Sequence, residues 1–123
     1  MAATLLLVED DAATRGLFEA LLTSAGFTVH GTGNGADALV RLRSGTFDLV
    51  VLDLLLPALT GLAVLKAMRQ NPTTAELPVI VVTGAVLSKQ DLMDLHGVTV
   101  LRKPVDPEDL IEAVDTTLAG RGR

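Results

Sequence analysis

The sequence contains no cysteine, no tryptophan and no tyrosine, and it has only three phenylalanines. The absence of cysteine excludes disulfides, thiol catalysis and cysteine-based metal sites, and it is typical of a protein in a reducing compartment. So few large aromatic rings leave no platform on which bases could stack. Basic residues are also few, because ten lysines and arginines oppose fifteen acids and leave a net charge of −5. We therefore predict no direct nucleic-acid binding.

Long hydrophobic runs are missing as well. The apolar start at residues 5–8 is too short for the core of a signal peptide, and it runs directly into three acids. The longest apolar stretches, 49–59 and 77–87, are interrupted by Asp53 and by Pro78. Neither approaches the roughly 18 apolar residues that a membrane-spanning helix needs. We predict a cytoplasmic protein with no membrane insertion.

Leucine, valine and alanine are abundant instead. Hydrophobic residues make up 49% of the 123 residues, which is enough for a sizeable core and excludes disorder. The length corresponds to one compact domain. A core rich in leucine and valine suits strands that are buried on both faces, as in a parallel sheet covered by helices.

Strand-like and helix-like segments alternate along the whole chain. Short apolar or β-branched runs predict strands over residues 4–8, 27–30, 47–52, 77–82 and 98–102. Apolar residues at helical spacing predict helices over residues 12–25, 36–43, 62–70 and 88–95, and a last helix from residue 106. This alternation indicates an α/β fold with a parallel sheet, two helices on one face and three on the other.

Polar residues follow the predicted strands at the point where each strand ends. In an open parallel sheet the carboxyl ends of the strands share one edge, and ligands bind there. Neighbouring strands lie about 4.8 Å apart, so acids that follow adjacent strands come within contact range. The residues placed at this edge are Glu9, Asp10, Asp11, Asp53, Thr83 and Lys103.

Carboxylates that meet at one edge repel one another. One pair at ~4 Å costs roughly 1 kcal/mol in water and about 4 kcal/mol in a medium of effective dielectric near 20. A hard divalent cation such as Mg²⁺ would hold the cluster, because it prefers oxygen ligands and commonly rests on carboxylates plus phosphate. Lys103 adds a fixed positive charge and Thr83 a hydroxyl donor, which suits a phosphoryl group in transfer. With no histidine-, cysteine- or serine-based triad, a carboxylate is the available nucleophile.

Four short motifs occur in order, each at the end of a predicted strand. They are Val-Glu-Asp-Asp at 8–11, Val-Leu-Asp at 51–53 with Pro57 and Gly61 after it, Val-Val-Thr-Gly at 81–84, and Lys-Pro at 103–104. In this order and spacing the sequence resembles the receiver domain of bacterial two-component response regulators. The resemblance covers residues 4–119, and we expect a flavodoxin-like doubly wound (βα)5 fold with strand order 2-1-3-4-5. The expected receiver domain spans residues 1–119, and 120–123 would be a tail or the start of a linker.

The resemblance implies a role for each acid. Asp53 corresponds to the phospho-acceptor, which attacks the phosphorus of a phosphohistidine on a sensor histidine kinase or a phosphotransfer protein. Asp10 corresponds to a direct Mg²⁺ ligand, and Glu9 to the holder of a metal-bound water. The Leu55 backbone carbonyl corresponds to a further ligand, so the implied metal site comprises these four residues.

Lys103 and Thr83 complete the implied site. Lys103 would pair with the Asp53 carboxylate and then with the phosphoryl oxygen, while Thr83 would hydrogen-bond that oxygen and move inward as the switch. The family also suggests a cis Lys103–Pro104 peptide. Such a domain assists its own phosphorylation and dephosphorylation, so we expect no separate substrate turnover. The output would be an altered protein-docking face, whose downstream target or fused effector the sequence leaves open.

Two other functions fit parts of the sequence. A pseudo-receiver would keep the fold as a phosphorylation-independent interaction module, but it would be expected to lose an acid, the lysine or the acceptor, and none is lost. A dinucleotide-binding enzyme would use the Gly-x-Gly-x-x-Ala run at 31–36, with Asp53 about twenty residues later. The chain lacks the second mononucleotide half, and Asn34 as a helix N-cap explains the run. Asp11 is likewise explained by the start of the first helix.

Two positions and one interval depart from the family pattern. The residue three before the lysine is usually aromatic and follows the threonine, but here it is Val100, and Val105 stands where phenylalanine is common. The resemblance implies that the residues two beyond the acceptor and two beyond the threonine flank the path of the hydrolytic water. Here they are Leu55 and Ala85, whose side chains cannot hydrogen-bond a water. The span from threonine to lysine is also short, so we predict a shortened fourth helical region. From Val100 and Val105 we predict an altered switch, and from Leu55 and Ala85 slow dephosphorylation.

Overall fold

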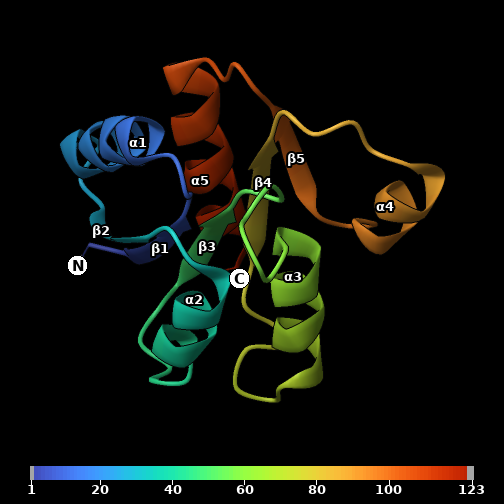
Figure 1. The fold of residues 1–123 in the computed structure, drawn as a ribbon. Helices are drawn as coiled ribbons and strands as arrows, with labels where there is room; N and C mark the ends of the chain where they lie inside the picture. The colour runs from blue at the N-terminus through green and yellow to red at the C-terminus, as the bar shows by residue number, and fades with distance from the viewer. Residues whose placement is uncertain (1, 122–123) are drawn as a thin grey trace.

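The computed structural model describes residues 2–121, in which five strands alternate with five helices as predicted (Figure 1). The strands are β1 (Thr4–Val8), β2 (Thr28–Thr32), β3 (Leu49–Leu52), β4 (Val79–Thr83) and β5 (Thr99–Arg102). The helices are α1 (Ala12–Ser24), α2 (Gly35–Leu42), α3 (Gly61–Gln70), α4 (Lys89–Asp94) and α5 (Pro107–Arg121). Across the described residues, no helix combines the length and the hydropathy that a membrane span requires.

The five strands form one parallel sheet in the order β2-β1-β3-β4-β5, which confirms the flavodoxin-like topology. The three central strands are buried along almost their whole length, which is why they appear in the sequence as unbroken apolar runs. Because all strands run in the same direction, their carboxyl ends meet at one edge. Val8 pairs with Leu52 there, so the residues that follow them, Glu9 and Asp53, leave the sheet side by side.

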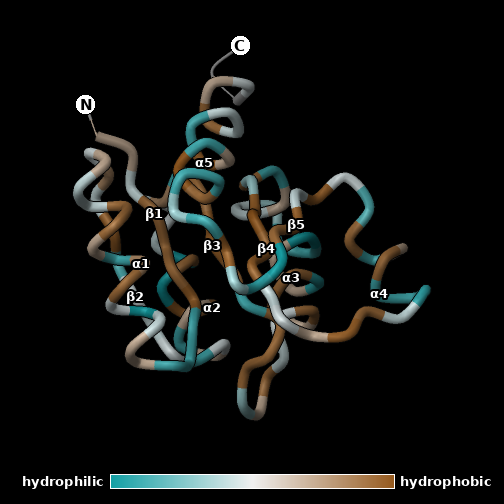
Figure 2. The backbone as a smooth tube through the Cα atoms, turned by 90° about the horizontal axis from the view of Figure 1, so that it is seen from above, coloured by the Kyte–Doolittle hydropathy of each residue, from teal (hydrophilic) through white to brown (hydrophobic). Residues whose placement is uncertain are grey.

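Hydrophobic residues pack in two layers, one on each face of the sheet, and the central strands are the most apolar part of the chain (Figure 2). Alternate strand residues point to opposite faces, Leu49 and Val51 to one and Val50 and Leu52 to the other. Helices α1 and α5 cover the first face. Helices α2 and α3 cover the second, and Leu95, directly after α4, packs on the same side. Two helices therefore cover one face of the sheet and three lie on the side of the other, as predicted.

Side-chain caps start the first four helices. Each capping side chain accepts a hydrogen bond from a backbone N–H in the first turn, which would otherwise lack a partner. The capping residues are Asp11, Asn34, Thr60 and Ser88. The predictions that Asp11 starts the first helix and that Asn34 caps the second are therefore confirmed. At Gly35 a Cβ would lie 2.8 Å from the Leu59 carbonyl oxygen, so this glycine makes room for the loop before α3.

Some strand boundaries differ from the predicted ones for physical reasons. β2 extends two residues beyond the predicted strand end at residue 30, because residues 31–32 pair with residues 7–8 of β1. β4 begins two residues later than predicted. The Leu77 carbonyl accepts a hydrogen bond from the Arg69 guanidinium at 2.8 Å, and Pro78 has no N–H to donate to a neighbouring strand.

The length of α4 and the start and end of α5 were also predicted. α4 has only six residues, none of them buried, so this region is short as expected. The Asp106 side chain accepts a hydrogen bond from the Glu108 N–H at 2.9 Å, which is the predicted start of α5. α5 runs to Arg121, beyond the expected domain end at residue 119. Residues 122–123 of the expected tail lie outside the described residues.

Candidate functional site

Three of the predicted acids converge at the carboxyl edge of the sheet. Glu9 and Asp10 follow β1 and Asp53 follows β3, and one carboxylate oxygen of each lies within 4.8 Å of the others. Glu9 and Asp53 are only 2% and 5% exposed, whereas Asp10 is exposed to solvent. Asp11 does not join them, because its carboxylate accepts hydrogen bonds from the N–H and the hydroxyl of Thr14 at the start of α1.

Lys103 links the two buried acids. Its Nζ donates a hydrogen bond to Asp53 Oδ2 at 2.8 Å and another to Glu9 Oε1. The lysine follows β5 directly, and its peptide bond to Pro104 is cis, as the resemblance implied. One ammonium group thus pairs with two carboxylates that would otherwise be buried without a counter-charge, which is costly.

Burial and pairing shift the pKa values of Glu9 and Lys103. Burial raises the pKa of the Glu9 carboxyl above its ordinary value, although hydrogen bonds from Lys103 and from the Asp11 N–H oppose the shift. Burial alone would lower the pKa of Lys103, but its hydrogen bonds to Asp53 and Glu9 outweigh that effect and raise it. Lys103 therefore stays protonated at neutral pH and supplies a permanent positive charge beside Asp53.

Asp53 is held in one orientation by contacts on both carboxylate oxygens and on its backbone. Oδ2 accepts from Lys103, and Oδ1 accepts from the Leu55 N–H at 3.0 Å. The Asp53 N–H donates to the Val8 carbonyl and continues the ladder between β1 and β3. Gly61, the first residue of α3, packs on the same backbone: a Cβ there would lie 2.2 Å from the Asp53 carbonyl oxygen. The close approach of α3 therefore requires glycine at this position.

Thr83 ends β4 at the same edge and is fully buried. Its hydroxyl oxygen accepts a hydrogen bond from the Ala85 N–H at 3.1 Å. The Ala85 carbonyl in turn accepts one from the Arg102 guanidinium at 2.6 Å. The loop after Thr83 is therefore tied to β5 through Ala85, while Val100 of β5 is a partly buried residue of the core.

Leu55 lies in the loop between β3 and α3, and its side chain is 59% exposed. Its backbone N–H orients Asp53, whereas the metal-binding role of its carbonyl stays a prediction. One residue at the site was not identified from the sequence: Arg15 of α1, whose Nη1 donates to the Glu9 carbonyl at 2.7 Å. Its position one helical turn after Asp11, facing back toward the acidic loop, is the signal that could have indicated it.

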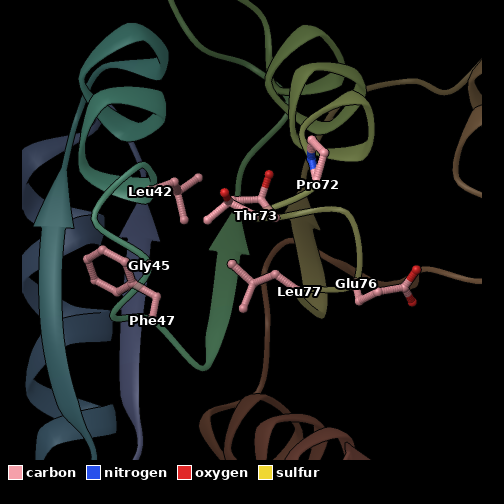
Figure 3. A pocket seen from close by; sticks show the side chains of 8 residues that line it. Leu42, Gly45, Phe47, Pro72, Thr73, Glu76 and Leu77 are labelled. Carbon is pink, nitrogen blue, oxygen red and sulfur yellow. The ribbon is translucent and has the colours of Figure 1, made fainter.

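A pocket of about 380 Å³ lies at the opposite edge of the sheet, near the amino ends of β3 and β4 (Figure 3). It is lined by Leu42, Gly45, Phe47, Pro72, Thr73, Thr74, Glu76 and Leu77. Its buried hydroxyl, that of Thr74, already donates to the Met68 carbonyl at 2.7 Å. None of the predicted site residues lines this pocket, so it is separate from the acid cluster.

A doubly wound parallel sheet with acids and a lysine at its carboxyl edge is the arrangement expected of a receiver domain. Comparison with known proteins identifies the same family. The family model of the response regulator receiver domain matches residues 5–115. The transcriptional regulatory protein DltR of Streptococcus agalactiae is 33% identical over 112 residues, which cover 89% of this chain and 49% of DltR. The chain spans about half the length of the curated relatives it matches.

Solved structures agree with this match. A CheY-like response regulator receiver domain protein from Methanospirillum hungatei is 26% identical with a TM-score of 0.89, covering 99% of this chain and 98% of that one. The chemotaxis protein CheY4 of Vibrio cholerae is 27% identical with a TM-score of 0.85, covering 94% and 98%. The chain belongs to the response regulator receiver domain family and is a receiver of two-component signal transduction.

Proposed function

We propose that this receiver accepts a phosphoryl group on Asp53 with the help of Mg²⁺ and passes the change to a protein-docking face. The observation that carries the proposal is the convergence of Glu9, Asp10 and Asp53 with Lys103 at one edge of the sheet. A structural ion pair needs only one acid for one lysine. Three ionised acids and one lysine leave a net charge of about −2, which a divalent cation would balance.

The donor set fits magnesium. The ligand oxygens of the three acids lie within 4.8 Å of one another, and carboxylate oxygens are the ligands that this hard cation prefers. Asp10 and Asp53 would bind the ion directly, Glu9 would hold one of its waters, and the Leu55 carbonyl would be a further ligand. The exposed side of the site, at Asp10, leaves room for the remaining waters. When bound, the ion would neutralise charge on the oxygens of a phosphoryl group.

The phosphoryl donor is proposed to be a phosphohistidine of a sensor histidine kinase or a phosphotransfer protein. A carboxylate oxygen of Asp53 attacks the phosphorus, and the new O–P bond forms as the N–P bond breaks. The electron pair of that bond stays on the imidazole nitrogen. Lys103, whose Nζ already lies 2.8 Å from Asp53, would then donate to a phosphoryl oxygen. Thr83 would turn its hydroxyl from Ala85 toward the same group.

The domain itself is proposed to contact proteins rather than nucleic acid, since its net charge is −5. Its curated relatives are named as transcriptional regulators, so an output module that binds DNA is compatible with this proposal. We place the domain in the cytoplasm with its kinase partner, and we assign it no separate substrate turnover. The phosphorylation-independent module is the rival function, and the geometry does not favour it, because every acid, the lysine and the threonine are in place.

Labelling with acetyl phosphate and Mg²⁺ tests the acceptor. We expect intact-mass analysis to show one added phosphoryl group on the wild type and none on Asp53→Asn. Asp37→Asn is the matched control, since Asp37 pairs with Arg41 on α2 and takes no part in the site. Label retained in Asp53→Asn would contradict the assignment. A wild type that takes no label from acetyl phosphate or from a kinase would favour the rival function.

Thermal unfolding in a Mg²⁺ titration tests the metal site. By mass action, an ion at about 100 times its Kd stabilises the native state by roughly 2.7 kcal/mol. We expect the midpoint of the wild type to rise with Mg²⁺ and that of Asp10→Asn to rise much less. The two proteins are compared by the change in unfolding midpoint on adding Mg²⁺ and not by the midpoint without metal, because removing one of three like charges stabilises the metal-free protein by itself. Equal shifts in both proteins would refute the site.

A further inference from the structure

The Arg15 side chain reaches from α1 to the backbone of the two acids that follow β1. Its Nη1 donates to the Glu9 carbonyl oxygen at 2.7 Å and approaches the Asp10 carbonyl oxygen at 3.4 Å. The Arg15 N–H also donates to the Asp11 carbonyl at 2.8 Å, so the residue lies on the first turn of the helix that Asp11 starts. One guanidinium thus bridges consecutive carbonyls of the acidic loop.

The guanidinium is confined by the neighbouring strand as well. A Cβ at Gly33 would lie 3.0 Å from Arg15 Nη1 and 3.5 Å from the Asp10 Cα. One at Gly31 would lie 1.8 Å from Glu19 Oε1 and 3.3 Å from the Arg15 Cδ. These glycines leave the space that the arginine occupies beside the end of β2. Arg15 is only partly exposed there.

We propose that Arg15 is a positioning residue for the acid cluster: it holds the backbone of Glu9 and Asp10 so that their carboxylates face Asp53. This inference rests on the proposed metal site. The Glu9 N–H donates to the Thr32 carbonyl, so the end of β1 is fixed on its donor side. Arg15 supplies the matching contact on the acceptor side, where β1 has ended and no strand donor follows. Without Arg15, the Glu9 and Asp10 carbonyls would both lose the guanidinium as a hydrogen-bond donor.

Charge and position predict opposite effects on metal binding, which makes the inference testable. A guanidinium near the site repels a cation, so removing only its charge would tighten Mg²⁺ binding. Losing its hold on the backbone would instead scatter the ligands and weaken binding. A hydrogen bond from a charged donor contributes more to stability than one between neutral groups. We expect Arg15→Gln to bind Mg²⁺ about tenfold more weakly. The loss is not larger because part of the lost hydrogen bond destabilises the fold and not the metal site, and because removing the positive charge favours binding of the cation.

The experiment measures Mg²⁺ affinity by calorimetric titration and amide hydrogen exchange of residues 9–11 in the metal-free protein. The variants are Arg15→Gln, Arg15→Lys and the control Arg41→Gln, which removes the same charge from a surface pair on α2. Circular dichroism and urea unfolding confirm that each variant is folded. We expect Arg15→Gln to bind about tenfold more weakly and to exchange faster at residues 9–11, Arg15→Lys to recover part of both, and Arg41→Gln to match the wild type.

Each result decides the question. A folded Arg15→Gln that binds Mg²⁺ as tightly as the wild type, or more tightly, would overturn the positioning role while leaving the metal site intact. Unchanged exchange at residues 9–11 would overturn it as well. A wild type that binds no Mg²⁺ would refute the proposed metal site and the inference with it, and only this outcome touches both.

Discussion

Replacing Gly61 with alanine would place a methyl group against the backbone of the phospho-acceptor. The new Cβ would lie 2.2 Å from the Asp53 carbonyl oxygen and 2.6 Å from the Leu54 Cα, whereas ordinary contact begins at 3.4 Å. Either the start of α3 or the backbone at Asp53 must therefore move by about 1.2 Å. Both obstacles are backbone atoms, so no side chain can rotate away to relieve the contact.

The cost of Gly61→Ala has two parts. Overpacking of this kind costs ~1–3 kcal/mol. The shift also strains the hydrogen bond from the Gly61 N–H to the Leu54 carbonyl, now 3.1 Å long, and a lost bond of this type costs about 0.5–1.5 kcal/mol. We expect the free energy of unfolding to fall by about 2–4 kcal/mol and the urea midpoint by about 1–2 M. A displacement near 1 Å at a reacting group can reduce a rate ~100-fold, so labelling of Asp53 should slow by one to two orders of magnitude.

Gly16→Ala is the matched control. Gly16 lies inside α1, and a Cβ there would meet no atom within 4 Å. Alanine in a helix interior is favoured over glycine by roughly 0.5–1 kcal/mol, so this variant should raise the urea midpoint and leave labelling unchanged. The same substitution is thus expected to act in opposite directions at two sites. A Gly61→Ala protein with wild-type stability and wild-type labelling would refute the reasoning from close approach.

Two further predictions concern the phosphorylated state. The side chains of Leu55 and Ala85 cannot hydrogen-bond a hydrolytic water, so self-dephosphorylation should be slow, and Leu55→Asn or Ala85→Glu should speed the loss of label from Asp53. Finding neither variant faster than the wild type would remove that argument. With Val100 lacking a ring to swing, the switch should act through the loop at 83–87, and beryllofluoride should shift amide signals there. Because Arg102 holds the Ala85 carbonyl, Arg102→Gln should enlarge these shifts, and a rearrangement centred on Val100 would contradict the prediction.

Much of the fold could be predicted from local pattern. β1, β3 and β4 are unbroken apolar runs because both faces of each are buried, and the helices begin at capping residues that can be seen in the sequence. The edge strand β2 could not be delimited in the same way. Its last two residues, 31–32, have the composition of a turn, and they form strand only because residues 7–8 of β1 pair with them. Pairing across the sheet decides where an edge strand stops.

Some features of the site could likewise be predicted from the sequence and others could not. The order of residues along the chain places acids, a threonine and a lysine directly after the strands, and parallel strands bring such residues to one edge. The sequence also predicted that Asp11 starts α1 while Asp10, its neighbour, belongs to the metal site, and the structure agrees. Two contacts could be seen only in the folded chain: Lys103 bonds to Glu9 as well as to Asp53, and the Arg15 guanidinium donates to the Glu9 carbonyl. The direction of a side chain depends on partners that lie far along the chain, and a local pattern does not contain them.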